Sequence, residues 1–138
     1  MTSNISITHP FQNDTQWKSL QTGIIDLAKK EVLARFEQVI AQEKPDGSLL
    51  TEADTEMQKK TQIFLEKNWP QYAFLGEESS VAEQEAAMNS DSGCWILDPV
   101  DGTSNFAIGI PVYSVSLALM VQGKLVAGLV YDPSRDEI

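Results

Sequence analysis

The chain has 138 residues, a formal net charge of −10 and one cysteine. The length fits one domain with a sizeable core, and 42% hydrophobic residues argue against disorder. The acidic balance argues against a nucleic-acid polymer as partner, and a lone cysteine excludes a disulfide framework and disfavours a thiolate zinc site. No signal peptide and no apolar stretch near ~18 residues is visible, so we expect a cytoplasmic protein that does not bind a membrane.

A long helix is predicted near the start of the chain. Asp14 or Thr15 is expected to cap it, and it is expected to run to about Glu43. Its apolar residues mostly recur every three or four positions, which indicates one stripe that faces the core. The segment 44–48 has the sequence Lys-Pro-Asp-Gly-Ser and predicts a turn that ends this helix.

A second helix is predicted from Thr51 to about Asn68. Thr51 and Asp54 have the spacing of a capping box, although Asp replaces the usual Glu or Gln at the last position. Pro70 ends the helical pattern. Two helices therefore precede the part of the chain in which the hydrophobic period changes.

The second half of the chain favours strands. Short apolar strands are predicted at Tyr72–Leu75 and Cys94–Leu97, with a surface loop over Ser79–Gly93 between them. Tyr113–Val121 and Leu125–Tyr131 flank a tight turn and are typical of an antiparallel hairpin. Two helices followed by a run of strands suggest the α+β class.

The acidic residues are unevenly distributed. Between Lys67 and Lys124 there is no Lys or Arg, yet this interval holds seven acids. Like charges at close range repel, so some of them need solvent or a cation. Three of the seven, Glu83, Glu85 and Asp91, have polar or small neighbours and are interpreted as part of a solvated loop.

The other acids of interest follow the two short strands. Glu77 follows the first, and Asp98 and Asp101 follow the second. Carboxylates are the ligands that Mg²⁺ prefers, and amides of the Gly102-Thr103-Ser104 segment would suit a phosphate. These residues are consistent with metal-assisted hydrolysis of a phosphate ester. Spacing alone leaves open that Asp98–Thr103 is only a turn, in which Asp and Gly serve the backbone conformation.

Four segments together resemble the inositol monophosphatase family. The run from Trp95 to Phe106, Trp-Ile-Leu-Asp-Pro-Val-Asp-Gly-Thr-Ser-Asn-Phe, closely resembles the signature of that family. Leu50–Asp54 resembles its Thr-x-x-Asp element, Phe74–Ser79 its Gly-Glu-Glu element, and Pro111–Tyr131 the hairpin after the signature. The family order is kept, and the resemblance covers most of the chain from the first helix onward.

The resemblance assigns roles to particular residues. It implies Mg²⁺ as cofactor, with Asp98 bridging two ions, and water attack on a small phosphorylated substrate without a covalent enzyme intermediate. Asp54 would be the hydrogen-bond partner of Thr103, which with Glu77 would position the water. The implied metal ligands are Glu77, Asp98, the carbonyl of Val100 and Asp101; the implied catalytic residues are Glu77, Thr103 and Asp54; the implied substrate-binding residues are Asp101, Gly102, Thr103 and Ser104.

The resemblance also implies a fold. Residues 1–138 would be the N-terminal, metal-binding part of a layered αβαβα sugar-phosphatase fold, with two helices on a mostly antiparallel sheet. Family members continue into a second half with a Trp-Asp-x-Ala-Ala-Gly-like segment, which this sequence does not contain. We therefore expect a fragment that is inactive alone, from a protein that is a homodimer when complete.

Alternatives remain for the function. Other substrates of the same family, such as histidinol phosphate or a 3′(2′)-phosphoadenosine nucleotide, are possible, and the turn at 44–48 resembles the one in those relatives. Lys44 corresponds loosely to a basic residue near the metals. A truncated homologue that binds metal without turnover is the alternative from a different class.

Overall fold

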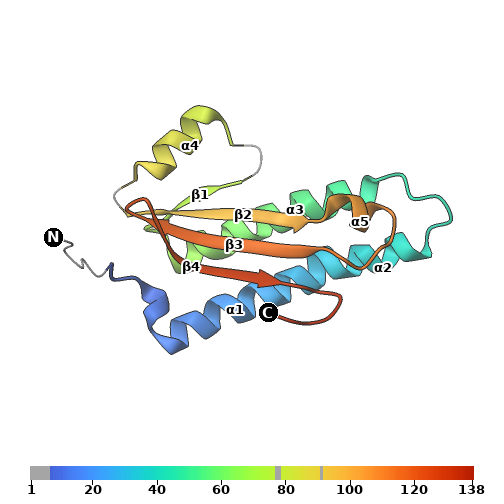
Figure 1. The fold of residues 1–138 in the computed structure, drawn as a ribbon, viewed down its shortest axis with the longest axis horizontal. Coiled ribbons are helices and arrows are strands. Elements are labelled where there is room, and N and C mark those ends of the chain that lie inside the picture. The colour runs from blue at the N-terminus through green and yellow to red at the C-terminus, as the bar shows by residue number, and fades with distance from the viewer. Residues whose placement is uncertain (1–6, 77–78, 91) are drawn as a thin grey trace.

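The described part of the chain forms a four-stranded sheet with helices packed against it (Figure 1). The computed structural model describes residues 7–76, 79–90 and 92–138. The main helices precede the strands, short helices lie between β-strands in the described part of the chain, and the architecture confirms the α+β class. None of the helices in the described part of the chain has the length and hydrophobicity needed to cross a membrane.

The first predicted helix is confirmed, with an unpredicted interruption. It consists of α1 (Asp14–Ala28), a π-helical turn η2 (Lys29–Leu33) and α2 (Ala34–Ala41). The cap is Asn13, whose side chain accepts a 3.1 Å hydrogen bond from the Gln16 amide. The expected caps at Asp14 or Thr15 are therefore wrong by one or two residues.

The π-helical turn keeps one row of side chains on the sheet. From Leu20 to Phe36 the buried residues recur at every fourth position, and Val39 follows after three: Leu20, Ile24, Ala28, Val32, Phe36 and Val39. In an α-helix of 3.6 residues per turn, steps of four drift around the axis by about 40° each. A turn with i→i+5 hydrogen bonds is wider and takes up this drift. The stripe therefore stays on one side of the helix from Leu20 to Phe36.

The second predicted helix is α3 (Ser48–Asn68), and it begins three residues before the predicted cap. Gly47, with φ of +82°, occupies the N-cap, and the Asp46 carboxylate accepts a 2.9 Å hydrogen bond from the Ser48 amide. Thr51 lies inside the first turn, where its hydroxyl donates to the Gly47 carbonyl. The prediction that Thr51 caps this helix is therefore wrong.

The sheet has the strand order β1-β2-β3-β4. β1 (Ala73–Leu75) is parallel to β2 (Cys94–Asp101), whereas β3 (Ser114–Val121) pairs antiparallel with both β2 and β4 (Lys124–Tyr131). The predicted hairpin and the mostly antiparallel sheet are confirmed. Gln122 and Gly123 form the turn with φ of +52° and +74°, as a type I′ hairpin requires.

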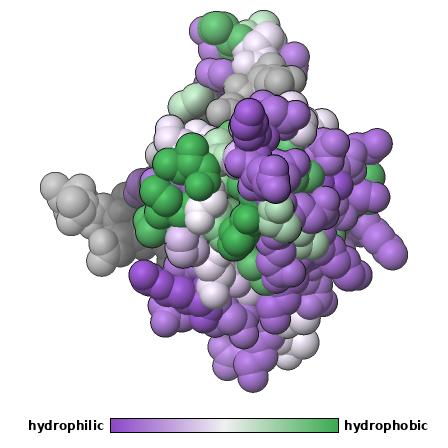
Figure 2. Space-filling view, turned by 90° about the vertical axis from the view of Figure 1, so that its right-hand side faces the viewer, coloured by the Kyte–Doolittle hydropathy of each residue, from purple (hydrophilic) through white to green (hydrophobic). Residues whose placement is uncertain are grey.

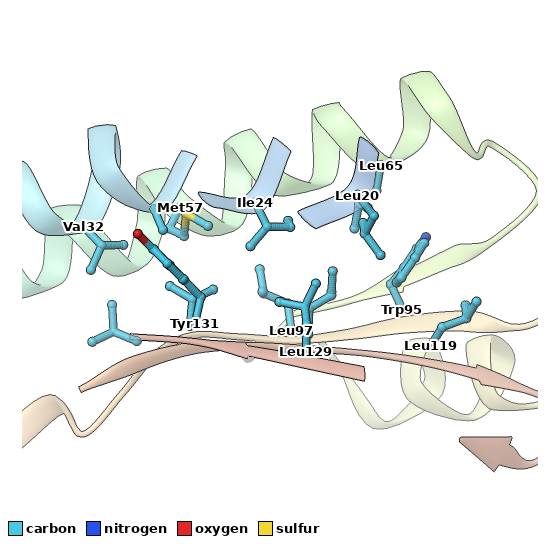
Figure 3. Packing of buried hydrophobic residues seen from close by; sticks show 14 of the residues in the cluster. Leu20, Ile24, Val32, Met57, Leu65, Trp95, Leu97, Leu119, Leu129 and Tyr131 are labelled. Atoms are coloured by element: carbon cyan, nitrogen blue, oxygen red, sulfur yellow. The ribbon is translucent and has the colours of Figure 1, made fainter. Parts of the chain in front are cut away.

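One face of the sheet is buried against α1, α2 and α3. Figure 3 shows side chains of α1 and α3 pointing toward the strands, and side chains of the strands pointing back. Alternate residues of β3 are buried, so its other face lies outside this core. The residues labelled in Figure 3 are Leu20, Ile24, Val32, Met57, Leu65, Trp95, Leu97, Leu119, Leu129 and Tyr131.

A short helix lies on the opposite face of the sheet, in part of the segment predicted as a loop. α4 (Val81–Met88) is capped by Ser80, whose hydroxyl accepts a 3.1 Å hydrogen bond from the Glu83 amide. Its Ala87 packs in a small second cluster with Leu75 and Cys94. The prediction of a continuous surface loop over 79–93 is therefore wrong for α4.

Candidate metal and phosphate site

Asp98 and Asp101 lie on the same, outer face of the sheet because β2 contains a bulge. Asp98 pairs with Ser116 of β3, and Asp101 pairs with Ser114, so three steps along β2 oppose two steps along β3. Without the extra residue, side chains three positions apart would point to opposite faces. Both carboxylates are exposed, whereas the intervening Pro99 and Val100 are buried.

The sequence interpretation placed both aspartates after the end of a strand, which is wrong for this strand. β2 continues through Asp98 to Asp101, and the irregularity lies inside it. Proline within a strand is confined to edges, first residues and bulges. Pro99 lies in the bulge and beyond the part of β2 that pairs with β1, and both positions tolerate proline.

The donor set suits a hard divalent cation. Asp98 and Asp101 offer carboxylate oxygens on one face, and the bulge carries the Val100 carbonyl between them. Burial raises the pKa of the Cys94 thiol, which keeps it protonated and unsuited to binding metal. In residues 7–76, 79–90 and 92–138 no group of three His, Cys, Asp or Glu side chains is close enough to hold an ion, and Glu77 lies outside these ranges.

The chain turns sharply after Asp101 and enters α5 (Thr103–Ala107). Gly102 forms this turn with φ of +91°, and a Cβ at its position would lie 2.7 Å from the Val112 carbonyl oxygen. Positive φ and this close approach both require glycine. Thr103 and Ser104 are exposed in the first turn of α5, directly beside the aspartates in the chain.

Asn105 holds the next loop against this turn. Its side-chain amide donates a 3.0 Å hydrogen bond to the Val112 carbonyl, and its backbone carbonyl accepts a 2.8 Å hydrogen bond from the Ile110 amide.

Figure 2 shows hydrophobic side chains exposed at this end of the molecule. The exposed large hydrophobic residues of α2 and the 108–112 loop are Ile40, Ile108, Ile110 and Val112.

Two predicted residues come from other elements. Asp54 is half-buried on α3, a helix that packs against both β2 and α5, so it approaches the site from the helical layer. Its hydrogen bond with Thr103 stays a prediction. Glu77 lies outside the described residues. Gly76, the residue before it in the chain, lines a hollow of about 360 Å³ between α4 and the sheet, and Asp98 lines the same hollow. Lys44 is exposed in the loop between α2 and α3.

Ser114 and Ser116 were not singled out by the sequence interpretation, although they lie across from the two aspartates. The alternation of β3 is the signal that finds them: Val115 and Leu117 are buried, which turns the serines to the outer face. Without the register of β2 against β3, that alternation does not say which residues they oppose.

Comparison with known proteins identifies relatives across nearly the whole chain. Residues 13–138 match the model of the inositol monophosphatase family. The inositol-1-monophosphatase of Mesorhizobium japonicum is 41% identical over 95 residues, which are 69% of this chain and 34% of that protein. Inositol monophosphatase 1 of Bos taurus is 30% identical over 129 residues, which are 94% of this chain and 46% of that protein.

A solved structure agrees with these sequence matches. The extragenic suppressor protein suhB of Bartonella henselae superposes with a TM-score of 0.66 and 32% identity, over 87% of this chain and 46% of that one. The chain therefore spans less than half the length of these three proteins.

Proposed function

This chain belongs to the inositol monophosphatase family, and from that premise we propose that it is the N-terminal, metal-binding part of a Mg²⁺-dependent phosphatase. The proposed reaction is hydrolysis of a small phosphomonoester such as inositol monophosphate. The observation that carries the proposal is the bulge in β2, which aligns Asp98 and Asp101 on one face beside the Gly102 turn. A homodimer in the cytoplasm is the proposed state of the complete protein.

The proposed ligands of Mg²⁺ are Asp98, Asp101, the Val100 carbonyl and Glu77, with Asp98 shared between two ions. Bound divalent ions supply an activated water and stabilise the oxygens of an in-line displacement. The interval 68–123 contains no Lys or Arg, so the negative charge of the aspartates is not offset by nearby bases in the sequence. That favours an external cation.

The turn after Asp101 is proposed to bind the phosphate. The amides of Gly102 and Thr103 and the adjacent Ser104 would face its oxygens, and glycine at position 102 permits the positive φ of this turn. Thr103, together with Glu77, would hold the attacking water, and Asp54 on α3 would orient the Thr103 hydroxyl. Positioning and charge stabilisation are the main contributions that a protein makes to phosphoryl transfer.

Substrate choice within the family stays open between inositol phosphates, histidinol phosphate and phosphoadenosine nucleotides. A homologue that binds metal without turnover is the second candidate function. The observation that favours it is the share of the relatives that this chain spans, 34% and 46% in the two examples. We propose that turnover needs residues equivalent to the remainder of those relatives.

The test joins this chain to the part of the Mesorhizobium japonicum relative that follows its matched region. We expect Mg²⁺-dependent phosphate release from the fusion and none from the 138-residue chain alone. Asp98→Asn should lower that rate by at least ~100-fold, because metal ions contribute several kcal/mol to transition-state stabilisation. Asp26→Asn, at an exposed position of α1, is the matched control and should retain the rate.

Near-normal turnover by Asp98→Asn would contradict the proposed metal role. Robust activity of the 138-residue chain alone would contradict the need for further residues. Rates on a panel of phosphate esters, measured with the fusion, would rank the three substrate classes. If the fusion folds and binds Mg²⁺ but releases no phosphate from any ester, the metal-binding homologue without turnover is favoured.

A further inference from the structure

Ser116 lies directly across the sheet from Asp98. Leu97 and Leu117, the preceding pair in the register, are both buried on the helical side, so Asp98 and Ser116 face the other way. Ser116 is half-buried and Asp98 is exposed. Directly opposed residues on one face have Cβ atoms ~4.5–5.5 Å apart, which is within reach of a hydrogen bond from a hydroxyl to a carboxylate.

We infer that Ser116 is a positioning residue for the Asp98 carboxylate. Its hydroxyl would donate to one carboxylate oxygen and thereby fix the orientation in which the carboxylate meets a cation. This inference depends on the metal role proposed for Asp98. Carboxylates that bind metals are generally hydrogen-bonded in turn, and removal of such a partner costs about 10–100-fold in metal affinity or activity.

On the outer face of β3, a serine lies opposite each of the two aspartates of β2, and other residue types lie opposite the remaining positions. On the outer face of β3, Ser114 lies opposite Asp101, whereas Ala118 lies opposite Ile96. The next outer residue, Met120, lies opposite Cys94. Cys94 and Met120 pack with Ala87 of α4, so the serines occupy the part of this face that lies beyond α4, where the aspartates are.

Ser116 is paired with strands on both sides. β3 is the strand between β2 and β4, and Ser116 pairs with Val130 on its other side. Its backbone is thus held by strands on both sides. A hydroxyl on such a strand holds a ligand more accurately than one on a loop.

The experiment measures binding of Mn²⁺, an ion that also takes oxygen ligands, to the 138-residue chain by the loss of the free-ion EPR signal. We expect Ser116→Ala to weaken binding by about 10-fold. Ser116→Thr keeps the hydroxyl and should bind as the unsubstituted chain does. Ser116→Val has nearly the shape of threonine without the hydroxyl and should bind like Ser116→Ala.

The controls separate this inference from the proposed function. Ala118→Ser adds a hydroxyl opposite Ile96 and should leave Mn²⁺ affinity unchanged. Circular dichroism and urea unfolding verify that each variant is folded. If Asp98→Asn loses Mn²⁺ but Ser116→Ala and Ser116→Val bind normally, the inference is wrong and the metal role stands. If the unsubstituted chain binds no better than Asp98→Asn, the metal role itself fails, and the inference fails with it.

Discussion

The Tyr131 hydroxyl donates a 2.6 Å hydrogen bond to the Asp136 carboxylate, which also lies 3.5 Å from Lys29 Nζ in the π-helical turn. Tyr131 is fully buried at the end of β4. The turn between them is closed by a backbone bridge between Asp132 and Glu137. The end of the sheet is thus attached to the point where the long helix widens.

We predict that this contact makes stability fall at acid pH. The hydrogen bond from Tyr131, and next the charge of Lys29, lower the pKa of Asp136. A carboxylate with a lowered pKa in the folded state stabilises that state above its unfolded pKa of about 3.9. This stabilisation is lost as the pH falls through the folded value. Asp136→Asn should therefore flatten the dependence of the unfolding midpoint on pH below about 4.

Urea unfolding between pH 2.5 and 6 measures this dependence. Asp26→Asn, at an exposed position without an ion pair among the described residues, is the matched control and should keep the slope of the unsubstituted chain. An unchanged acid slope in Asp136→Asn would show that the contact does not contribute.

A second prediction concerns the turn beside the candidate site. Gly102 and Gly47 both have positive φ, +91° and +82°, but only Gly102 has a backbone atom within 4 Å of the Cβ position. Gly47→Ala should cost about 1–2 kcal/mol, the penalty for an L-residue in this conformation. Gly102→Ala should cost more, because the clash with the Val112 carbonyl adds to the same penalty.

The free energies of unfolding of the two variants, measured in urea, provide the comparison. Because the φ penalty is common to both, their difference reports the close approach at Gly102 alone. Equal losses of unfolding free energy in the two variants would mean that the 108–113 loop moves aside without a cost in stability.

A third prediction concerns the packing of α1 against α3. A Cβ at Gly23 would collide with Cζ of the Phe64 ring. That ring in turn packs edge-on against Trp69, with centroids 5.8 Å apart. Alanine in a helix interior is normally about 1 kcal/mol more favourable than glycine. Here the collision should reverse the sign and make Gly23→Ala destabilising by about 1–3 kcal/mol.

The reversal is tested in a double-mutant cycle. In the Phe64→Ala background the obstacle is gone, and Gly23→Ala should stabilise by about 1 kcal/mol. The same sign in both backgrounds would contradict direct contact between these positions.

Several elements could be predicted from the sequence because each carries a local signal. The alternation in β3 and the turn at Gln122-Gly123 identified the hairpin, since both depend on residues close in the chain. The stripe from Leu20 to Phe36 identified the long helix. The π-helical turn was not predicted, because spacings of three and four are also typical of an uninterrupted α-helix.

α4 was missed because its packing is weak. Only Ala87 of its residues is buried, so the helix shows almost no apolar stripe. Ser80 and Glu83 nevertheless have capping-box spacing, and their side chains are hydrogen-bonded in the structure. The polar cap, not the hydrophobic pattern, was the available signal.

Most of the candidate site could be located from one contiguous stretch, Asp98 to Ser104, because its chemistry is concentrated there. The arrangement of that stretch could not be predicted, because the face on which Asp101 lies depends on the pairing of β2 with β3. The same long-range pairing decides which serines oppose the aspartates.

The bulge also determines what a mutational scan can detect. The extra residue of a bulge leaves the regular ladder of backbone hydrogen bonds, and the proposed ligand at Val100 is a backbone carbonyl. Every substitution at this position changes only a side chain that is 2% exposed. Such a scan would therefore classify Val100 with the hydrophobic core, and only replacement of the peptide bond by an ester, with its weaker carbonyl acceptor, would probe the oxygen itself.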